Sequence, residues 1–213
     1  MTRHNPYNDS YNFNYESPER FTSYYYQVKS ILTITPKSVL EIGKGSGIVG
    51  YYLRRLGIDY LALDIDVTTN TRHSSLCRKA SNTEKAFDVI LCAQVLKHVD
   101  FELLDGVFNQ FYEVCKRGVV ISLPYTGFHI TFSIIMSKIK KRMSVCIPLP
   151  YTYKCRDPST GSKWGLERII NGYLITEKDI IKKLVTSGLS KVKCFHNPEN
   201  PHHKFFIAIK TNR

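Results

Sequence analysis

The chain has 213 residues, 43% of them hydrophobic, which is enough for one domain with a substantial core. Its formal net charge of +12 favours partners with negative charge over positively charged ones. No apolar run approaches the roughly 20 residues of a membrane span, and the polar start is unlike a signal peptide, so we expect a cytoplasmic protein. The six cysteines lack CxxC pairs or other metal-ligand spacing, so we expect reduced thiols and no metal site.

The amino-terminal part of the chain is polar and rich in tyrosine. We expect residues 1–16 to be flexible and residues 17–36 to form a helical lead-in, because apolar residues recur at helical spacing from about Pro18 to Leu32. Residues 1–213 as a whole are expected to form a single domain, since domains usually have about 100 to 200 residues.

A glycine-rich loop follows the first predicted strand. Ser38–Ile42 is a short apolar run, which suits a buried strand. The loop has glycine at every second position, which lets the chain turn sharply and brings bare backbone against a ligand: Gly43, Gly45 and Gly47. We therefore expect this loop to hold a cofactor.

A helix and a second strand follow the loop. Apolar residues recur at helical spacing from Ile48 to Leu56, and Gly57 stands where a left-handed cap ends a helix. The next apolar run, from Tyr60 to Leu63, ends at Asp64, which places a carboxylate at the carboxyl end of a second parallel strand. Ribose hydroxyls are bound at this place in such folds, so Asp64 is the predicted ribose ligand.

Two cofactor classes use this layout. Residues 45–50 fit the dinucleotide pattern GxGxxG, but Gly50 and Asp64 are only 14 positions apart, fewer than the spacing of about 20 in that motif. The segment also reads as Glu41-x-Gly-x-Gly-x-Gly with Asp64 downstream. In this form it resembles motif I and the following acidic motif of the class I S-adenosylmethionine-dependent methyltransferases.

The resemblance continues along the chain. Phe87–Cys92, followed by Ala-Gln-Val-Leu-Lys-His-Val, is similar to the fourth strand of that family and the segment after it, with His98 at the histidine position. A helical stripe between residues 102 and 116 and a β-rich run at Val119–Leu123 match the next helix and the fifth strand.

The carboxyl-terminal part is similar to the end of the same family. Thr176–Asp179 has the pattern of a capping box and predicts a helix to about Ser187. Residues 191–195 and 204–210 read as two strands joined by the turn at residues 198–201, similar to the antiparallel hairpin that closes the methyltransferase sheet.

The resemblance implies a Rossmann-like α/β fold, with helices on both faces of a mostly parallel seven-stranded sheet whose last strand is antiparallel. It also implies S-adenosylmethionine (SAM) as the cofactor and methyl transfer as the activity. The glycine loop would surround the methionine part of SAM, Asp64 would hold the ribose, and Ile65 would lie against adenine. The implied cofactor-binding residues are Glu41, Ile42, Gly43, Gly45, Ser46, Gly47, Asp64, Ile65 and Gln94. Tyr24 and Tyr25 would either cover the cofactor or pack in the core.

Some residues depart from the family pattern. Lys44 places a cation inside the loop, and Gln94 and Lys97 stand where acidic residues are common, so the mouth of the pocket is more basic than usual. The stretch Leu76–Lys79 lacks the acidic residue that many relatives offer to adenine. A binding protein that keeps the fold and transfers nothing is therefore the alternative, with a nicotinamide oxidoreductase third.

A general base is needed only when the methyl acceptor starts protonated. His98 is the candidate, because histidine titrates near neutral pH and this one follows the fourth strand. The alternative for His98 is a structural role at a helix end or beside the cofactor loop. Tyr125, after the fifth strand, is a second candidate for orienting the substrate.

Charge is unevenly distributed and indicates the substrate class. Residues 1–120 carry 14 Lys and Arg against 13 Asp and Glu, whereas residues 121–213 carry 16 against 5. We expect residues 125–173 to form an inserted basic cap, in which cations lie among aromatic residues that can hold phosphates and stack on bases. This predicts an anionic substrate, either a small molecule or RNA.

The same segment has two other interpretations. The run of cations at Lys138 to Arg142 can be a solvated face, with the aromatic residues packing the cap. Alternatively, Phe132–Met143 can form a basic amphipathic helix on an anionic membrane. The histidines near Cys194 suggest a metal site or a turn, and we favour the turn because no second cluster completes a ligand set.

Overall fold

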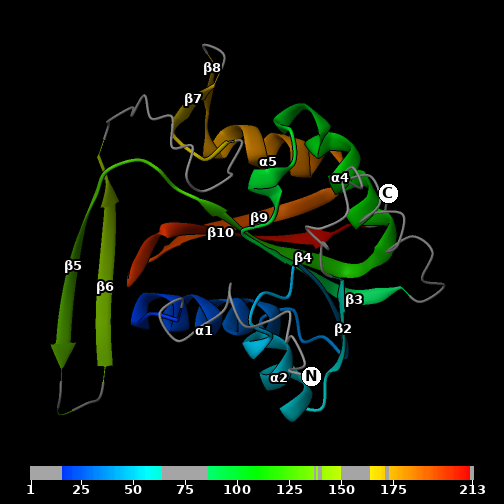
Figure 1. The fold of residues 1–213 in the computed structure, drawn as a ribbon, viewed down its shortest axis with the longest axis horizontal. Helices are drawn as coiled ribbons and strands as arrows, with labels where there is room; N and C mark the ends of the chain where they lie inside the picture. The colour runs from blue at the N-terminus through cyan, green and yellow to red at the C-terminus, as the bar shows by residue number, and fades with distance from the viewer. Residues whose placement is uncertain are drawn as a thin grey trace, which may run out of the picture.

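The computed structural model describes residues 16–63, 86–136, 138, 141–149, 164–170 and 173–211. A six-stranded sheet with the order β2-β1-β3-β4-β10-β9 crosses the molecule (Figure 1). Its strands are β1 (Ser38–Ile42), β2 (Asp59–Leu63), β3 (Phe87–Ala93), β4 (Cys115–Pro124), β9 (Leu189–Asn197) and β10 (Asn200–Lys210). The first four strands are parallel, whereas β10 is antiparallel to both β4 and β9. The predicted α/β fold and antiparallel last strand are confirmed.

The described residues contribute six of the seven expected strands to this sheet. The segment expected around the third strand, Leu76–Lys79, lies outside the described residues, as do Asp64 and Ile65.

Among the described residues, four helices cover the two faces of the sheet. They are α1 (Pro18–Leu32), α2 (Ile48–Arg55), α4 (Leu104–Val114) and α5 (Glu177–Thr186). Helices α1 and α2 lie on one face, and α4 and α5 lie on the other (Figure 1). Alternating residues of the central strands feed the two cores: Val89 and Leu91 pack with α1 and α2, whereas Ile90 and Cys92 pack with α4 and α5.

Local sequence explains several helix boundaries. The predicted start of α1 is confirmed, because Pro18 is its first residue and the Ser17 hydroxyl accepts a hydrogen bond from the Arg20 amide at 3.3 Å. The capping box of α5 is also confirmed, with the Thr176 amide donating to Asp179 at 2.8 Å. Helix α4 begins two residues later than expected, because Phe101–Leu103 forms a separate turn of 3₁₀ helix.

Residues 129–148 form an antiparallel hairpin of β5 (His129–Met136) and β6 (Lys141–Pro148). The amphipathic helix considered for Phe132–Met143 is therefore wrong. Apolar residues alternate with polar ones between Ile130 and Ile134, which is compatible with a strand, and pairing with β6 completes the hairpin. A shorter hairpin follows, formed by β7 (Arg168–Ile170) and β8 (Tyr173–Ile175).

The described aromatic residues of the expected cap do not form one surface; Tyr151 and Tyr153 lie outside the described residues. Trp164 is buried, and its indole N–H donates to the Val99 carbonyl at 2.7 Å. Tyr125 is buried as well, whereas Phe128 and Phe132 are exposed. Part of the segment therefore packs the core. Within the part of the chain that the structure describes, no helix is long and apolar enough to cross a membrane.

Candidate cofactor and substrate site

The carboxyl ends of β1, β2 and β3 meet at one edge of the sheet, because these strands are parallel neighbours. The loop after β1 is attached to the end of β2 by a hydrogen bond of 2.7 Å from the Gly43 amide to the Leu63 carbonyl. The residue after β3, Gln94, is attached to β4 by a bond of 2.9 Å from its amide to the Ser122 carbonyl. Both connections are thus fixed at the edge where parallel sheets bind ligands.

The glycine loop has a conformation that suits glycine. Gly43, Gly45 and Gly47 all have positive φ, and Gly47 immediately precedes α2. A Cβ atom on Gly43 would lie 2.3 Å from Cγ2 of Val95, so this position has no room for a side chain. The loop therefore presents bare backbone, as the sequence predicted.

Cavities lie on both sides of this loop. One, of about 70 Å³, lies toward β3 and is lined by Glu41, Gly43 and Gln94 among others. The other, of about 540 Å³, lies toward β2 and is lined by Ser46, Gly47 and residues of β2. Lys44 and Gly45 line both. We call the smaller one the loop cavity.

The Glu41 carboxylate is buried and accepts a hydrogen bond from the Tyr60 hydroxyl of β2. The Tyr60 ring also lies against α2, because a Cβ atom on Gly50 would lie 2.3 Å from it. Gly50 is the third glycine of the alternative dinucleotide pattern. In this fold it allows α2 to approach β2 closely, and the residues lining the two cavities beside the loop do not include it.

Gln94 has a strained backbone. Its φ is +60°, which is uncommon for a residue other than glycine, and its side-chain amide donates to the Ser122 hydroxyl at 3.4 Å. Such strain costs about 1–3 kcal/mol and is typically found at functional sites. Gln94 lines the loop cavity, as expected for a residue near the cofactor.

The structure adds two basic residues to the loop cavity that the sequence analysis missed. Arg20 from α1 and His203 from β10 both line it. Burial, together with the positive charges of Arg20, Lys97 and His202, lowers the pKa of His203 to about 4. Burial and the Arg20 charge also lower the pKa of Lys97. Arg20 and His203 thus form a basic cluster with Lys97, which does not itself line the loop cavity but whose charge acts on His203.

The His203 ring is neutral near pH 7, and its Nδ1 atom is buried without a hydrogen-bond partner among the described residues. A buried polar atom is normally hydrogen-bonded, so one that lines a cavity points to a ligand.

His98 lies in the short 3₁₀ helix Leu96–His98 after β3 and is half-buried. The residues that line the loop cavity include His203 but not His98. The metal site considered for the carboxyl-terminal histidines is not formed by the described residues, where no group of three potential ligands occurs. Cys194 instead donates to the Glu177 carboxylate at 2.7 Å, and His202 and His203 lie in β10, not in a turn.

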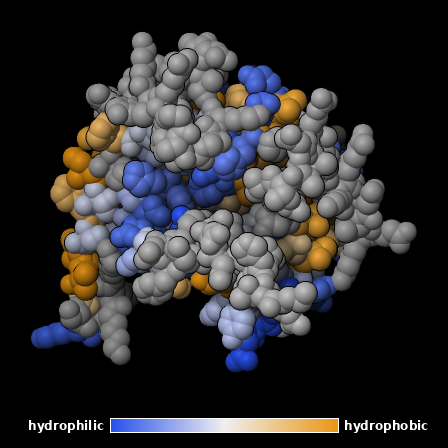
Figure 2. All heavy atoms as spheres, in the orientation of Figure 1, coloured by the Kyte–Doolittle hydropathy of each residue, from blue (hydrophilic) through white to orange (hydrophobic). Residues whose placement is uncertain are grey.

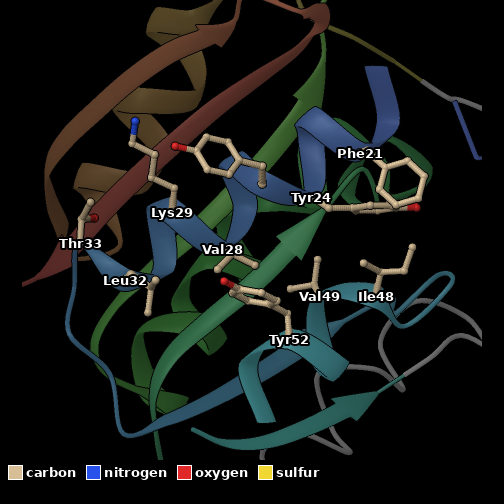
Figure 3. A pocket seen from close by; sticks show the side chains of 10 residues that line it. Phe21, Tyr24, Val28, Lys29, Leu32, Thr33, Ile48, Val49 and Tyr52 are labelled. Carbon is tan, nitrogen blue, oxygen red and sulfur yellow. The ribbon is translucent and has the colours of Figure 1, made fainter. Parts of the chain in front are cut away.

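An apolar groove of about 640 Å³ runs between α1 and α2 (Figure 3). Tyr24 lines both this groove and the loop cavity. Its hydroxyl accepts a hydrogen bond from Ser46 of the glycine loop at 3.1 Å and donates to Glu16 at 3.1 Å. Of the two tyrosines considered as cofactor covers, Tyr24 is therefore the one that contacts the loop, whereas Tyr25 is 58% exposed.

A family model described as a methyltransferase domain matches residues 19–144, which is more than half of the chain. This range contains all of α1 except its first residue, the glycine loop, and strands β1 to β5. The comparison with curated proteins found no match.

Solved structures of methyltransferases share the fold. A SAM-dependent methyltransferase from Archaeoglobus fulgidus has a TM-score of 0.58 and 16% identity, over 91% of this chain and 95% of that one. DesVI from Streptomyces venezuelae has a TM-score of 0.52 and 11% identity, over 91% and 94%. Magnesium protoporphyrin IX methyltransferase from Synechocystis PCC 6803, solved with bound S-adenosylhomocysteine, has a TM-score of 0.50 and 12% identity, over 94% and 89%.

Proposed function

Because the chain belongs to the class I SAM-dependent methyltransferase family, we propose that it transfers the methyl group of SAM to a small substrate with a negatively charged group, bound at the loop cavity. Arg20 and His203 line this cavity, and the charge of Lys97 acts on His203. This basic cluster supports the proposal.

The residues at the loop fit the cofactor. The glycine loop, whose glycines have no side chains to block a ligand, lies between two cavities, one on the β2 side and one on the β3 side. Asp64, the proposed ribose ligand, directly follows Leu63, which is bonded to the loop through Gly43. When bound, SAM supplies an electrophilic methyl group on a positively charged sulfur. The proposed cofactor ligands remain those expected from the sequence.

The protein's own residues orient the substrate. The positive charge of Arg20 lowers the pKa of Lys97. The two like charges repel each other, and this repulsion costs free energy. An anion bound between them would remove that repulsion, and His203 could donate one hydrogen bond to it. A carboxylate or phosphate on the substrate would thus be held at the side of the glycine loop that faces Gln94.

A small molecule is a better fit to this site than RNA. Tyr125 and Trp164, two of the aromatic residues considered for base stacking, are buried in the core. The charged groups that remain at the site line a cavity rather than an open surface.

The proposed general base for acceptors that start protonated is still His98. A comparison of kcat for His98→Asn and His203→Asn tests this assignment. A loss of kcat in His98→Asn alone supports it, and a loss in His203→Asn alone assigns the role to the histidine at the loop cavity.

Titration calorimetry tests the cofactor part of the proposal. The protein should bind SAM and S-adenosylhomocysteine but not NAD, and Asp64→Ala should weaken binding of both adenosyl ligands. Absence of heat from either adenosyl ligand would overturn the proposal. Binding without turnover on any acceptor would favour a protein that keeps the fold as a binding module.

Turnover on matched pairs of acceptors tests the substrate part. Small carboxylic acids and the amides of the same acids should be offered with radiolabelled SAM. Arg20→Gln and Lys97→Gln should lower kcat/KM about tenfold or more for the acids, which corresponds to the loss of one charged hydrogen bond. The same variants should leave the amides unchanged, and equal losses on both members of a pair would contradict the proposed role.

A further inference from the structure

The β5–β6 hairpin has the reverse of the usual polarity. An antiparallel sheet normally packs its apolar face on the core and exposes its polar face. In this hairpin three successive cross-strand pairs of one face are apolar: Ile130 with Ile147, Phe132 with Val145, and Ile134 with Met143. The next pair on that face is Met136 with Lys141. The other face carries the pairs Thr131 with Cys146 and Ser133 with Ser144, followed by Ile135 with Arg142.

The polar face is the one turned toward the rest of the molecule. Ser144 and Cys146 line a cavity of about 450 Å³ together with Tyr26 from α1 and Lys204 from β10. The Thr131 hydroxyl on the same face is buried. The body of the protein therefore covers the part of this face formed by Thr131, Ser144 and Cys146, whereas Ser133 and Ile135 on the same face are exposed.

The apolar face points away from the body. Its six side chains are each between 44% and 64% exposed: Ile130, Phe132, Ile134, Met143, Val145 and Ile147. The hairpin stands beside the six-stranded sheet at the left of Figure 1, and apolar side chains gather along the same edge in Figure 2. A contiguous exposed apolar surface of this kind marks an interaction site.

The charge of the hairpin indicates its partner. Residues 128–149 contain four cations, Lys138, Lys140, Lys141 and Arg142, and no acidic residue. In the sequence all four stand at positions 138–142, after the last residue of β5, Met136, and up to the second residue of β6. Apolar side chains next to a cluster of lysine and arginine are typical of segments that bind an anionic membrane surface.

We propose that the β5–β6 hairpin docks the protein on an anionic lipid bilayer. The apolar face enters the region between headgroups and acyl chains, and the four cations lie against anionic headgroups. A second copy of this chain is a poorer fit, because it carries the same formal net charge of +12 and the two copies repel each other. The proposal is independent of SAM and of the substrate.

Vesicle sedimentation tests this docking without any enzymatic readout. The protein should bind vesicles of phosphatidylcholine with phosphatidylserine more tightly than vesicles of phosphatidylcholine alone, and added salt should weaken the binding. The double variant Phe132→Ser with Ile134→Ser should bind at least about tenfold more weakly, because it lacks two large apolar side chains that would move from water into the bilayer. Lys138→Gln with Lys140→Gln should reduce the preference for the anionic lipid.

A matched control removes equally exposed apolar side chains elsewhere. Leu103→Ser with Val185→Ser changes residues that are 55% and 50% exposed outside the hairpin, and its binding should equal that of the unmodified protein. Circular dichroism confirms that each variant is folded.

Failure of the unmodified protein to bind anionic vesicles would overturn the proposal, and so would equal binding by the hairpin variant. Sedimentation equilibrium completes the test. A dimer that dissociates in the hairpin variant, with no vesicle binding, would reassign the face to contact between copies.

Discussion

At the scale of single residues, Tyr24 joins the amino-terminal helix to the glycine loop. Its hydroxyl accepts the hydrogen bond from Ser46 and donates one to Glu16, and burial raises the pKa of Tyr24 to about 12, so the hydroxyl stays protonated. The Tyr24 side chain can therefore fix the orientation of the glycine loop to which a cofactor would bind.

We expect Tyr24→Phe to weaken S-adenosylhomocysteine binding roughly fivefold, because a net hydrogen bond is worth about 1 kcal/mol. Titration calorimetry measures the change. Tyr25→Phe is the matched control, since it removes the hydroxyl of the adjacent exposed tyrosine and should leave the affinity unchanged. Equal affinities for the two variants would show that the loop does not depend on Tyr24.

His203 makes a pH-dependent contribution to stability. Its pKa is about 4 in the folded protein and 6.5 without burial. Above pH 6.5 the ring is neutral in both states. Between pH 6.5 and 4 the unfolded chain takes up a proton that the folded protein excludes, so the free energy of unfolding falls by up to about 3 kcal/mol.

The variant His203→Gln should lose this dependence. Urea unfolding at intervals from pH 7 to 4 should give a curve that falls less steeply below pH 6.5 than that of the unmodified protein. The difference between the two curves gives the contribution of His203, because the carboxylates and the other histidines titrate in both proteins. Parallel curves would contradict the assigned pKa.

The sequence predicted some of these residues and not others, for a physical reason. Glu41, Gly43 and Gln94 lie in or next to strands whose motifs are local, so their meeting at one sheet edge follows from the parallel order. Arg20 and His203 come from opposite ends of the chain and meet through tertiary packing. One feature of the sequence could have placed His203 at the site. It lies near the start of an antiparallel strand, and such a strand starts at the edge where the parallel strands end.

At the scale of elements, α2 and β2 are held together by the contact of Gly50 with Tyr60. We expect Gly50→Ala to lower the free energy of unfolding by about 1–3 kcal/mol, because the new methyl group overlaps the ring. The ring has little room to move away, since its hydroxyl is bonded to Glu41 and the Arg54 guanidinium lies over its face at 4.6 Å.

Gly106→Ala is the matched control for this prediction. Gly106 lies inside α4, and a Cβ atom there would meet nothing within 4 Å. This variant should raise the free energy of unfolding by about 0.5–1 kcal/mol, since alanine favours the helix over glycine. Denaturant unfolding measures the free energy of unfolding of both variants. A loss of stability in Gly106→Ala would show that the effect of Gly50→Ala does not depend on the lack of space beside Tyr60.

The elements also show where sequence reasoning failed. Helical spacing predicted α1 correctly and a capping box predicted α5, because both signals lie within a single segment. The structure adds the cap of α1 at Ser17, which the sequence analysis did not name. Phe132–Met143 fits a helical face about as well as an alternating strand, and the choice between them depends on pairing with a second segment. Local pattern alone could not decide it.

At the scale of the whole molecule, the amino-terminal helix α1 meets the hairpin of β9 and β10 beside the site. Asn197, at the end of β9, is buried and donates to the hydroxyls of Thr22 and Ser23 in α1, each at 3.1 Å. Asn200, at the start of β10, also donates to Ser23 at 3.1 Å. The carboxyl-terminal hairpin therefore holds α1, the helix that carries Tyr24 to the loop.

We expect Asn197→Ala to lower the free energy of unfolding by about 1–3 kcal/mol, because two hydroxyls lose their buried partner. It should also weaken S-adenosylhomocysteine binding, since α1 would position Tyr24 less firmly against Ser46. Asn109→Ala, at an exposed position of α4, should change neither quantity. Denaturant unfolding and calorimetry separate the two effects. A loss of stability with unchanged affinity would mean that α1 reaches the glycine loop through its packing on α2 and the sheet alone, independently of the carboxyl-terminal hairpin.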